Sequence, residues 1–173
     1  CNPPLRHDYR QPMTNDSPHI ALFQPDIAGN TGAIMRLAAC FGLAVDIIEP
    51  AGFDLSDRNL KRAGMDYLEL ATLVRHRSWE HFEDWRRQEG RRLILFTTSG
   101  GTVYTDFAFQ PRDILLFGRE SAGVPDYVHK AADERVIIPM REGARSLNLA
   151  MAAAIGSSEA LRQIRSAQPP VAG

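Results

Sequence analysis

The sequence has little cysteine, no long apolar run and almost no net charge. Its two cysteines, Cys1 and Cys40, are too few for a disulfide framework or a cysteine-based zinc site, so a reducing compartment, the cytoplasm, is expected. No apolar run approaches the ~20 residues of a membrane-spanning helix, and no segment resembles a signal peptide, so no membrane partner is expected. The formal net charge is −1, so binding to nucleic acid would require a local basic patch.

Several motifs of known ligand-binding and catalytic sites are also absent. No G-x-G-x-x-G follows the first expected strand, which argues against a dinucleotide site. The segment GRESAG lacks the Lys and Ser/Thr of a phosphate-binding loop, and no G-x-S-x-G supplies a hydrolase nucleophile. His76 and His81 have the wrong spacing for a helical zinc pair, so both are expected to lie in solvent and no metal site is expected.

The sequence does contain a regular alternation of short apolar runs and amphipathic segments. We expect one domain at residues 18–166, with a disordered leader at 1–17 and a flexible tail at 167–173. The alternation predicts an α/β fold, with a mostly parallel sheet and helices on both faces. Strands are expected within residues 19–25, 43–50, 68–76, 91–101, 113–118 and 134–140, and helices within 30–42, 56–64, 78–90, 125–133 and 149–166.

Residue types at the helix ends predict where the helices begin and stop. Asn30 or Thr31 is expected to cap the first helix, and Gly42 to end it. Ser78 is expected to cap the helix that carries Trp79, Phe82 and Trp85 at helical spacing. The arginines at 86 and 87 on that helix are expected to be solvated.

Small and polar residues gather where the expected strands end. They occupy residues 25–32, 97–101, 118–123 and 139–148. In open α/β sheets, ligands bind at the carboxyl ends of the strands. The four loops therefore predict one ligand site.

Three stretches, in order, carry a family pattern. They are NTGAIMRLAACFG (Asn30–Gly42), LLFGRESAGVP (Leu115–Pro125) and IIPMREGARSLNLAMAAAI (Ile137–Ile155). They resemble the three signature motifs of the SpoU branch of the SPOUT RNA methyltransferases. The stretch EPAGFDLSDRNLKRAGMDY (Glu49–Tyr67) is similar to that of the short members that act on the anticodon loop of tRNA.

The resemblance implies a fold, a cofactor and an activity. The fold would be an α/β knot with a deep C-terminal trefoil, a rare exception to the usual topology rules. The cofactor would be S-adenosyl-L-methionine, without a metal, and the enzyme a homodimer with shared active sites. The reaction would methylate the ribose 2′-hydroxyl of the wobble nucleotide, a cytidine or uridine, in the anticodon stem-loop of tRNA, with leucine isoacceptors as the expected substrates.

The resemblance also implies roles for particular residues. The cofactor site would comprise Phe96, Thr97, Gly118, Ile138, Met140, Ser146 and Leu147. The catalytic set would comprise Arg36, Asn30, Glu120, Ser146 and Asn148. The family assigns the arginine to the 2′-hydroxyl, often as general base. Because free arginine stays protonated, Arg36 is alternatively expected to hold a phosphate or to lower the pKa of the hydroxyl by its charge.

Basic residues near these motifs are candidates for RNA contact. Lys61 and Arg62 lie in the stretch that resembles the anticodon-loop enzymes, and Arg141 and Arg145 precede the last motif, so all four are expected to bind RNA. Arg119 replaces the proline that is commoner in the family, and it is expected either to contact phosphate or to face solvent.

Three other interpretations stay open at the level of sequence. The same chemistry could act on another tRNA position or on rRNA. The chain could be an RNA-binding module without catalysis, although the catalytic set argues against this. It could also be a doubly wound domain that binds a small molecule and no RNA.

Overall fold

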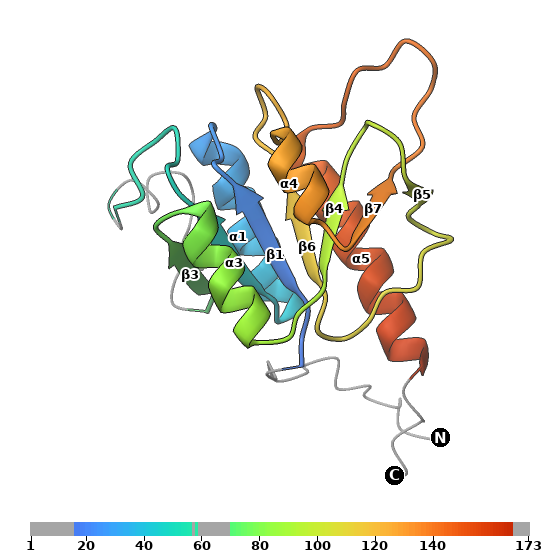
Figure 1. Cartoon of the computed structure of the whole chain (residues 1–173), viewed down its shortest axis with the longest axis horizontal. Helices are drawn as coiled ribbons and strands as arrows, with labels where there is room; N and C mark the ends of the chain where they lie inside the picture. The colour runs from blue at the N-terminus through green and yellow to red at the C-terminus, as the bar shows by residue number, and fades with distance from the viewer. Residues whose placement is uncertain (1–15, 57, 59–69, 168–173) are drawn as a thin grey trace, which may run out of the picture.

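A parallel sheet forms the centre of the molecule (Figure 1). The structure is a computed structural model, and it describes residues 16–56, 58 and 70–167. Among these residues, seven strands lie in the order β3-β2-β1-β6-β4-β7-β5, and each neighbouring pair is parallel. The strands are β1 (His19–Phe23), β2 (Ala44–Ile48), β3 (Thr72–His76), β4 (Leu93–Phe96), β5 (Thr102–Val103), β6 (Ile114–Phe117) and β7 (Glu134–Ile137).

Helices cover both faces of this sheet, which confirms the expected fold class. Helices α1 (Ala28–Phe41) and α5 (Leu149–Ala167) lie on one face, and α3 (Trp79–Gln88) and α4 (Asp126–Ala131) on the other (Figure 1). No described helix is long and apolar enough to cross a membrane. Residues 57 and 59–64 of the expected helix at 56–64, most of the expected leader and most of the expected tail lie outside the described residues.

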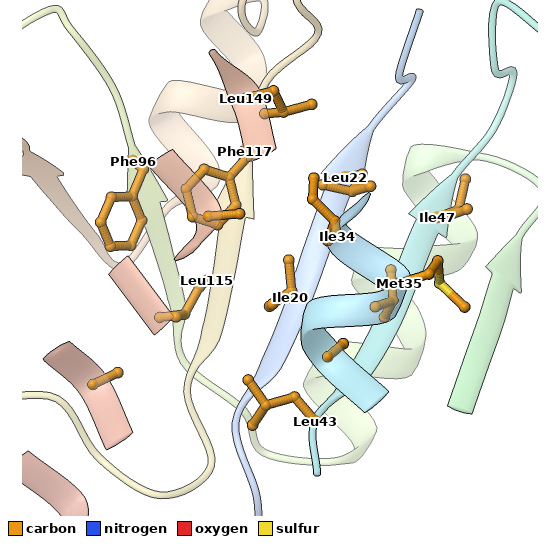
Figure 2. Close-up of a cluster of buried hydrophobic side chains, with 14 of the residues drawn as sticks. Ile20, Leu22, Ile34, Met35, Leu43, Ile47, Phe96, Leu115, Phe117 and Leu149 are labelled. Atoms are coloured by element: carbon orange, nitrogen blue, oxygen red, sulfur yellow. The ribbon is translucent and has the colours of Figure 1, made fainter. Parts of the chain in front are cut away.

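Alternation along the strands builds one core on each face of the sheet. Ile20 and Leu22 of β1 pack with Ile34 of α1 (Figure 2), whereas Ala21 and Phe23 of the same strand point to the side of α3 and α4. Successive side chains of a strand point to opposite faces, so the apolar run Ile20–Phe23 of β1 serves both cores. Each large side chain buried in this way contributes roughly 1.5–3 kcal/mol relative to exposure.

The helix ends confirm two of the three expected signals. Gly42 ends α1 with a φ of 70°, and the Ser78 side chain accepts a hydrogen bond from the His81 N–H at 3.2 Å. The expected cap of α1 is wrong, because α1 begins at Ala28 and Asn30 and Thr31 lie inside its first turn. The residue before the helix is Ile27, which has no side chain able to cap it. Strand β5 was not expected, because two residues carry no detectable period.

A buried histidine–aspartate cluster joins the first three strands. The expectation that His76 lies in solvent is wrong, since it is 1% exposed. Its Nε2 lies 2.7 Å from one oxygen of Asp46, and His19 Nδ1 lies 2.6 Å from the other. Burial alone would raise the pKa of Asp46, but the hydrogen bonds from both imidazoles outweigh it and lower this pKa below its usual value. His81 is exposed, as expected.

Arg86 was expected to be solvated and is instead buried. Its Nε and Nη2 donate to the two oxygens of Glu83 at 2.7 and 2.9 Å. Its Nη1 donates to the carboxylate of Asp133 at 2.9 Å and to the carbonyl of Arg91 at 3.0 Å. These charge-assisted bonds fasten the end of α3 to the segments that enter β4 and β7. Arg87 is exposed, as expected.

We predict that Asp46→Asn lowers the free energy of unfolding at pH 7 by about 3 kcal/mol, because it removes a buried charge that is hydrogen-bonded to two imidazoles. Since the folded-state pKa of Asp46 is below its unfolded value, its stabilisation is present at neutral pH and is lost as the pH falls through the folded pKa. The difference between wild type and variant should therefore shrink below about pH 4. Urea denaturation at several pH values, followed by tryptophan fluorescence, measures both effects.

Asp84→Asn is the matched control, because Asp84 is exposed on α3. It should change the free energy of unfolding by less than about 0.5 kcal/mol. Equal effects of the two substitutions would contradict the stabilising role of the cluster.

Candidate active site at the carboxyl edge of the sheet

A cavity of about 540 Å³ opens at the carboxyl ends of the central strands. Small-molecule sites typically occupy about 300–1,000 Å³. The wall comes from all four loops that were expected to converge, at residues 25–32, 97–101, 118–123 and 139–148. The expected convergence of the four loops on one cavity is confirmed, and binding of a ligand there stays a prediction.

Most of the expected site residues lie in this wall. The expected cofactor residues all line the cavity: Phe96, Thr97, Gly118, Ile138, Met140, Ser146 and Leu147. Of the expected catalytic set, the cavity is lined by Asn30, Glu120, Ser146 and Asn148.

The remaining expected residues lie elsewhere. Arg36 is exposed on α1 and is not part of the wall. Arg141 and Arg145 are exposed on the loop between β7 and α5, also outside the wall. Lys61 and Arg62 lie outside the described residues, so the structure does not test their expected contact with RNA.

The Glu120 carboxylate binds the backbone that leads into helix α1 and the side chain of Asn30 in its first turn. Its Oε2 accepts the Asp26 N–H at 2.7 Å, and its Oε1 accepts the Ile27 N–H at 3.3 Å and the Asn30 Nδ2 at 3.2 Å. The first N–H groups of a helix have no partner within the helix, and its positive end attracts an anion. The N–H groups that Glu120 accepts precede the helix, so its carboxylate holds the backbone that enters α1 and places a negative charge near the start of a helix that Ile27 cannot cap.

Two asparagines extend this contact to helix α5. Asn148 Nδ2 donates to Asn30 Oδ1 at 3.0 Å, while Asn148 Oδ1 accepts from the N–H groups of Ala150 and Met151 at 2.9 and 3.3 Å. Asn148 is thus the N-terminal cap of α5. Because each amide donates on one side and accepts on the other, the orientation of both side chains is fixed by their partners. We call the Glu120–Asn30–Asn148 chain of hydrogen bonds the polar relay.

The loop after β6 closes on itself and needs both of its glycines. Arg119 and Gly123 exchange two backbone hydrogen bonds, at 3.0 and 2.9 Å. A Cβ on Gly118 would lie 2.6 Å from the Gly123 carbonyl carbon, and Gly123 has a φ of 63°. Ser121 fastens this loop to Asp26, through its backbone N–H at 3.1 Å and through its hydroxyl. The glycines therefore permit the close backbone approach that shapes the cavity.

An aromatic stack forms the apolar side of the cavity. The Phe96 and Phe117 rings lie 4.8 Å apart at an interplanar angle of 20°. Behind Phe96, a Cβ on Gly156 of α5 would lie 2.6 Å from the ring. Gly156 thus allows α5 to lie directly on the ring that lines the cavity.

Sequence reasoning missed several residues of the wall, among them Phe117, Val124, His129 and Leu149. Phe117 and Leu149 had a usable signal, since each neighbours an expected site residue within a family motif. His129 had none, because a histidine on a short helix such as α4 gives no indication of which face meets a loop.

The fold and the cavity together define a parallel α/β protein with a ligand-sized cavity at the carboxyl ends of its strands, where ligands bind in such sheets. The model of the SpoU rRNA Methylase family matches residues 17–157, and the chain belongs to this family.

The chain is also similar to a named relative and to solved structures. A tRNA (cytidine(34)-2′-O)-methyltransferase of Ancylobacter novellus is 56% identical over 144 residues, which cover 83% of this chain and 91% of the relative. A solved structure from work on the 2-OH methylation of C/U34 on tRNA is 37% identical, with a TM-score of 0.82, and the match covers 88% of this chain and 99% of that one. The SpoU methyltransferase AviRb of Streptomyces viridochromogenes, solved with AdoMet, is 31% identical, with a TM-score of 0.79 and coverages of 91% and 61%.

We predict that Glu120→Gln loosens the start of α1. The amide replaces one acceptor oxygen by a donor and removes the charge that faces the helix N-terminus, so the free energy of unfolding should fall by about 1 kcal/mol. Backbone amides of residues 26–31 should exchange faster with deuterium, which mass spectrometry of peptides measures.

Glu142→Gln is the control, because Glu142 is exposed on the loop before α5. It should leave the exchange of residues 26–31 unchanged. Unchanged exchange in the Glu120 variant as well would show that the carboxylate does not hold the start of the helix.

Proposed function

We propose that this chain methylates tRNA, transferring a methyl group from S-adenosyl-L-methionine to the ribose 2′-hydroxyl of the wobble nucleotide, C34 or U34. The polar relay is the structural observation that carries the proposal, since it places all three family motifs around one ligand-sized cavity. The names of the relatives at 56% and 37% identity support the position of the methylated nucleotide. Membership of the SpoU rRNA Methylase family supports methyl transfer as the reaction.

The cavity suits the proposed cofactor. Phe96, Ile138 and Leu147 offer an apolar slot for an adenine ring, and the wall also carries polar groups such as Thr97 and Ser146. Gly118 leaves its backbone open to close approach. When bound, S-adenosyl-L-methionine supplies an electrophilic methyl group on a sulfonium, a good leaving group, so no metal is required.

The relay residues are proposed to position the reacting ribose. Asn30 and Asn148 each carry two amide hydrogens and two lone pairs, so each can bind a ribose while it holds its neighbour. Both carboxylate oxygens of Glu120 already accept hydrogen bonds at the start of α1, so a positioning role suits Glu120 better than proton transfer. A guanidinium is a cation with donors and no acceptor, so we propose that Arg36 holds the 2′-hydroxyl or the adjacent phosphate by its charge.

A homodimer would bring Arg36 to the site. On its own chain Arg36 lies outside the cavity wall. The apolar side chains of Ile27, Leu147 and Met151, at the start of α1 and of α5, are 50%, 38% and 60% exposed. Exposed apolar groups that lie near one another commonly mark an interface. We therefore infer a dimer in which each cavity meets Arg36 of the other chain.

The remaining parts of the proposal follow from the family. We infer the trefoil knot, with α5 passing through a loop, from the likeness to the SpoU methyltransferase structures. We propose RNA contacts at Lys61, Arg62, Arg141 and Arg145, leucine isoacceptors as substrates, and action in the cytoplasm, where mature tRNA is used.

Transfer of a labelled methyl group tests the function directly. The protein is incubated with labelled S-adenosyl-L-methionine and tRNA from cells that lack wobble 2′-O-methylation, and mass spectrometry locates the product. We expect a 2′-O-methyl group at nucleotide 34, as in the named relatives. Arg36→Ala should lower kcat by about a hundredfold or more, with little change in the affinity for S-adenosyl-L-homocysteine.

The other outcomes separate the parts of the proposal. A 2′-O-methyl group at another nucleotide would keep the chemistry and overturn the wobble assignment. Absence of transfer to both tRNA and rRNA would contradict the function. A loss of S-adenosyl-L-homocysteine affinity equal to the loss of rate in Arg36→Ala would contradict the role of Arg36.

We further predict that Gly156→Ala weakens binding of S-adenosyl-L-homocysteine about tenfold, because overpacking behind Phe96 displaces a ring that lines the cavity. Isothermal titration calorimetry measures the affinity. Gly29→Ala on α1 is the control, since a Cβ there would meet no atom within 4 Å. Equal affinities of the two variants would show that the ring does not set the shape of the cofactor site.

A further inference from the structure

Arg119 places an uncommitted positive charge in the wall of the cavity. Among the described residues that line the cavity, the fixed charges belong to Arg119 and Glu120. Glu120 is used by the N-terminus of α1, where both of its oxygens accept hydrogen bonds. The charge of Arg119 is therefore the one that remains to meet a ligand.

The contacts of Arg119 hold the side chain without neutralising it. Its Nη2 donates to Oε1 of Gln24, a neutral acceptor, and it forms no ion pair with a described residue. Asp26 lies within its electrostatic reach, but the pKa of Asp26 is lowered first by the hydrogen bonds from Ser121, and the charge of Arg119 contributes least. A tether to an uncharged group fixes the guanidinium and leaves its charge available.

Two features indicate that this arrangement serves a ligand. Arg119 Nε is buried and has no hydrogen-bond partner among the described residues. Buried polar groups are nearly always paired, so an unpaired one beside a cavity calls for an explanation. Gln24, which holds the guanidinium, has a φ of 45°, a conformation that residues with a Cβ rarely adopt and that recurs at functional sites.

We propose, building on the function above, that Arg119 binds the carboxylate of the methionyl end of the cofactor. That carboxylate is the sole anionic group of S-adenosyl-L-methionine, and guanidinium and carboxylate form strong charge-assisted hydrogen bonds. RNA phosphate is the less suitable anion, because Arg119 is only partly exposed in the cavity wall, whereas Arg141 and Arg145 are exposed on the neighbouring loop. Arg119 thereby becomes a residue that selects the amino-acid end of the ligand.

Binding of two ligands to one variant tests this assignment. Calorimetry compares S-adenosyl-L-homocysteine with its decarboxylated analogue, which keeps the adenosine, the thioether and the amine. Arg119→Met should weaken binding of S-adenosyl-L-homocysteine about tenfold and change that of the analogue by less than about twofold. Binding of the analogue also shows that the variant is folded.

Gln24→Glu is the matched variant. This variant keeps the size of the side chain and its hydrogen bond to Arg119, but it pairs the guanidinium with a carboxylate. It should therefore weaken binding of S-adenosyl-L-homocysteine and not that of the analogue. If Arg119 had a structural role alone, this variant would bind both ligands with unchanged affinity.

The remaining results overturn the assignment or the function separately. Equal losses for the two ligands in Arg119→Met would show a structural role. Unchanged affinity for S-adenosyl-L-homocysteine with weaker, less salt-dependent binding of tRNA would show a phosphate contact instead. Either result leaves the proposed function intact as long as wild type methylates tRNA, whereas failure of wild type to bind S-adenosyl-L-homocysteine would contradict both.

Discussion

The hydrogen bonds between the Glu120 carboxylate and the N-terminus of α1 determine the arrangement of the rest of the site. Helix α1 lacks a capping side chain of its own, and the backbone that enters it is held by Glu120, which follows β6 in the chain. Asn30 and Asn148 carry the same contact to the start of α5. Two helices and one loop therefore satisfy one another's polar groups, and none of the three parts has its final geometry alone. A site assembled in this way forms only when the folded sheet brings these three segments together.

This dependence explains which parts of the molecule could be predicted from sequence. Strands and helices depend on local periodicity, so the alternation was enough to predict the α/β class and the convergence of four loops. The cap of α1 could not be found in this way. A local rule assigned it to Asn30 or Thr31, whereas the carboxylate that holds the entry to α1 belongs to Glu120, 94 residues away from Asp26.

The predictions that His76 and Arg86 lie in solvent were wrong for the same reason. Each is a polar residue of a kind that usually faces solvent, and each is buried against a carboxylate from another element. Asp46 lies 30 residues from His76, and Asp133 lies 47 residues from Arg86. Such pairings need the tertiary fold, because nothing in the local pattern of β3 or α3 indicates that a partner exists. The family motifs, in contrast, named residues from distant parts of the chain that line one cavity, such as Asn30, Glu120 and Asn148.

The same reasoning bears on the loop after β6 that carries Arg119. A residue that only shaped the loop would need no charge, because the backbone bonds between positions 119 and 123 and the two glycines already fix its course. An arginine with a structural role alone would be expected to meet a carboxylate, as Arg86 does with Glu83 and Asp133. Arg119 meets the neutral amide of Gln24 instead. A fixed but unneutralised guanidinium in a cavity wall stabilises an anion that enters the cavity, so an arginine at this position is best understood through an anionic ligand.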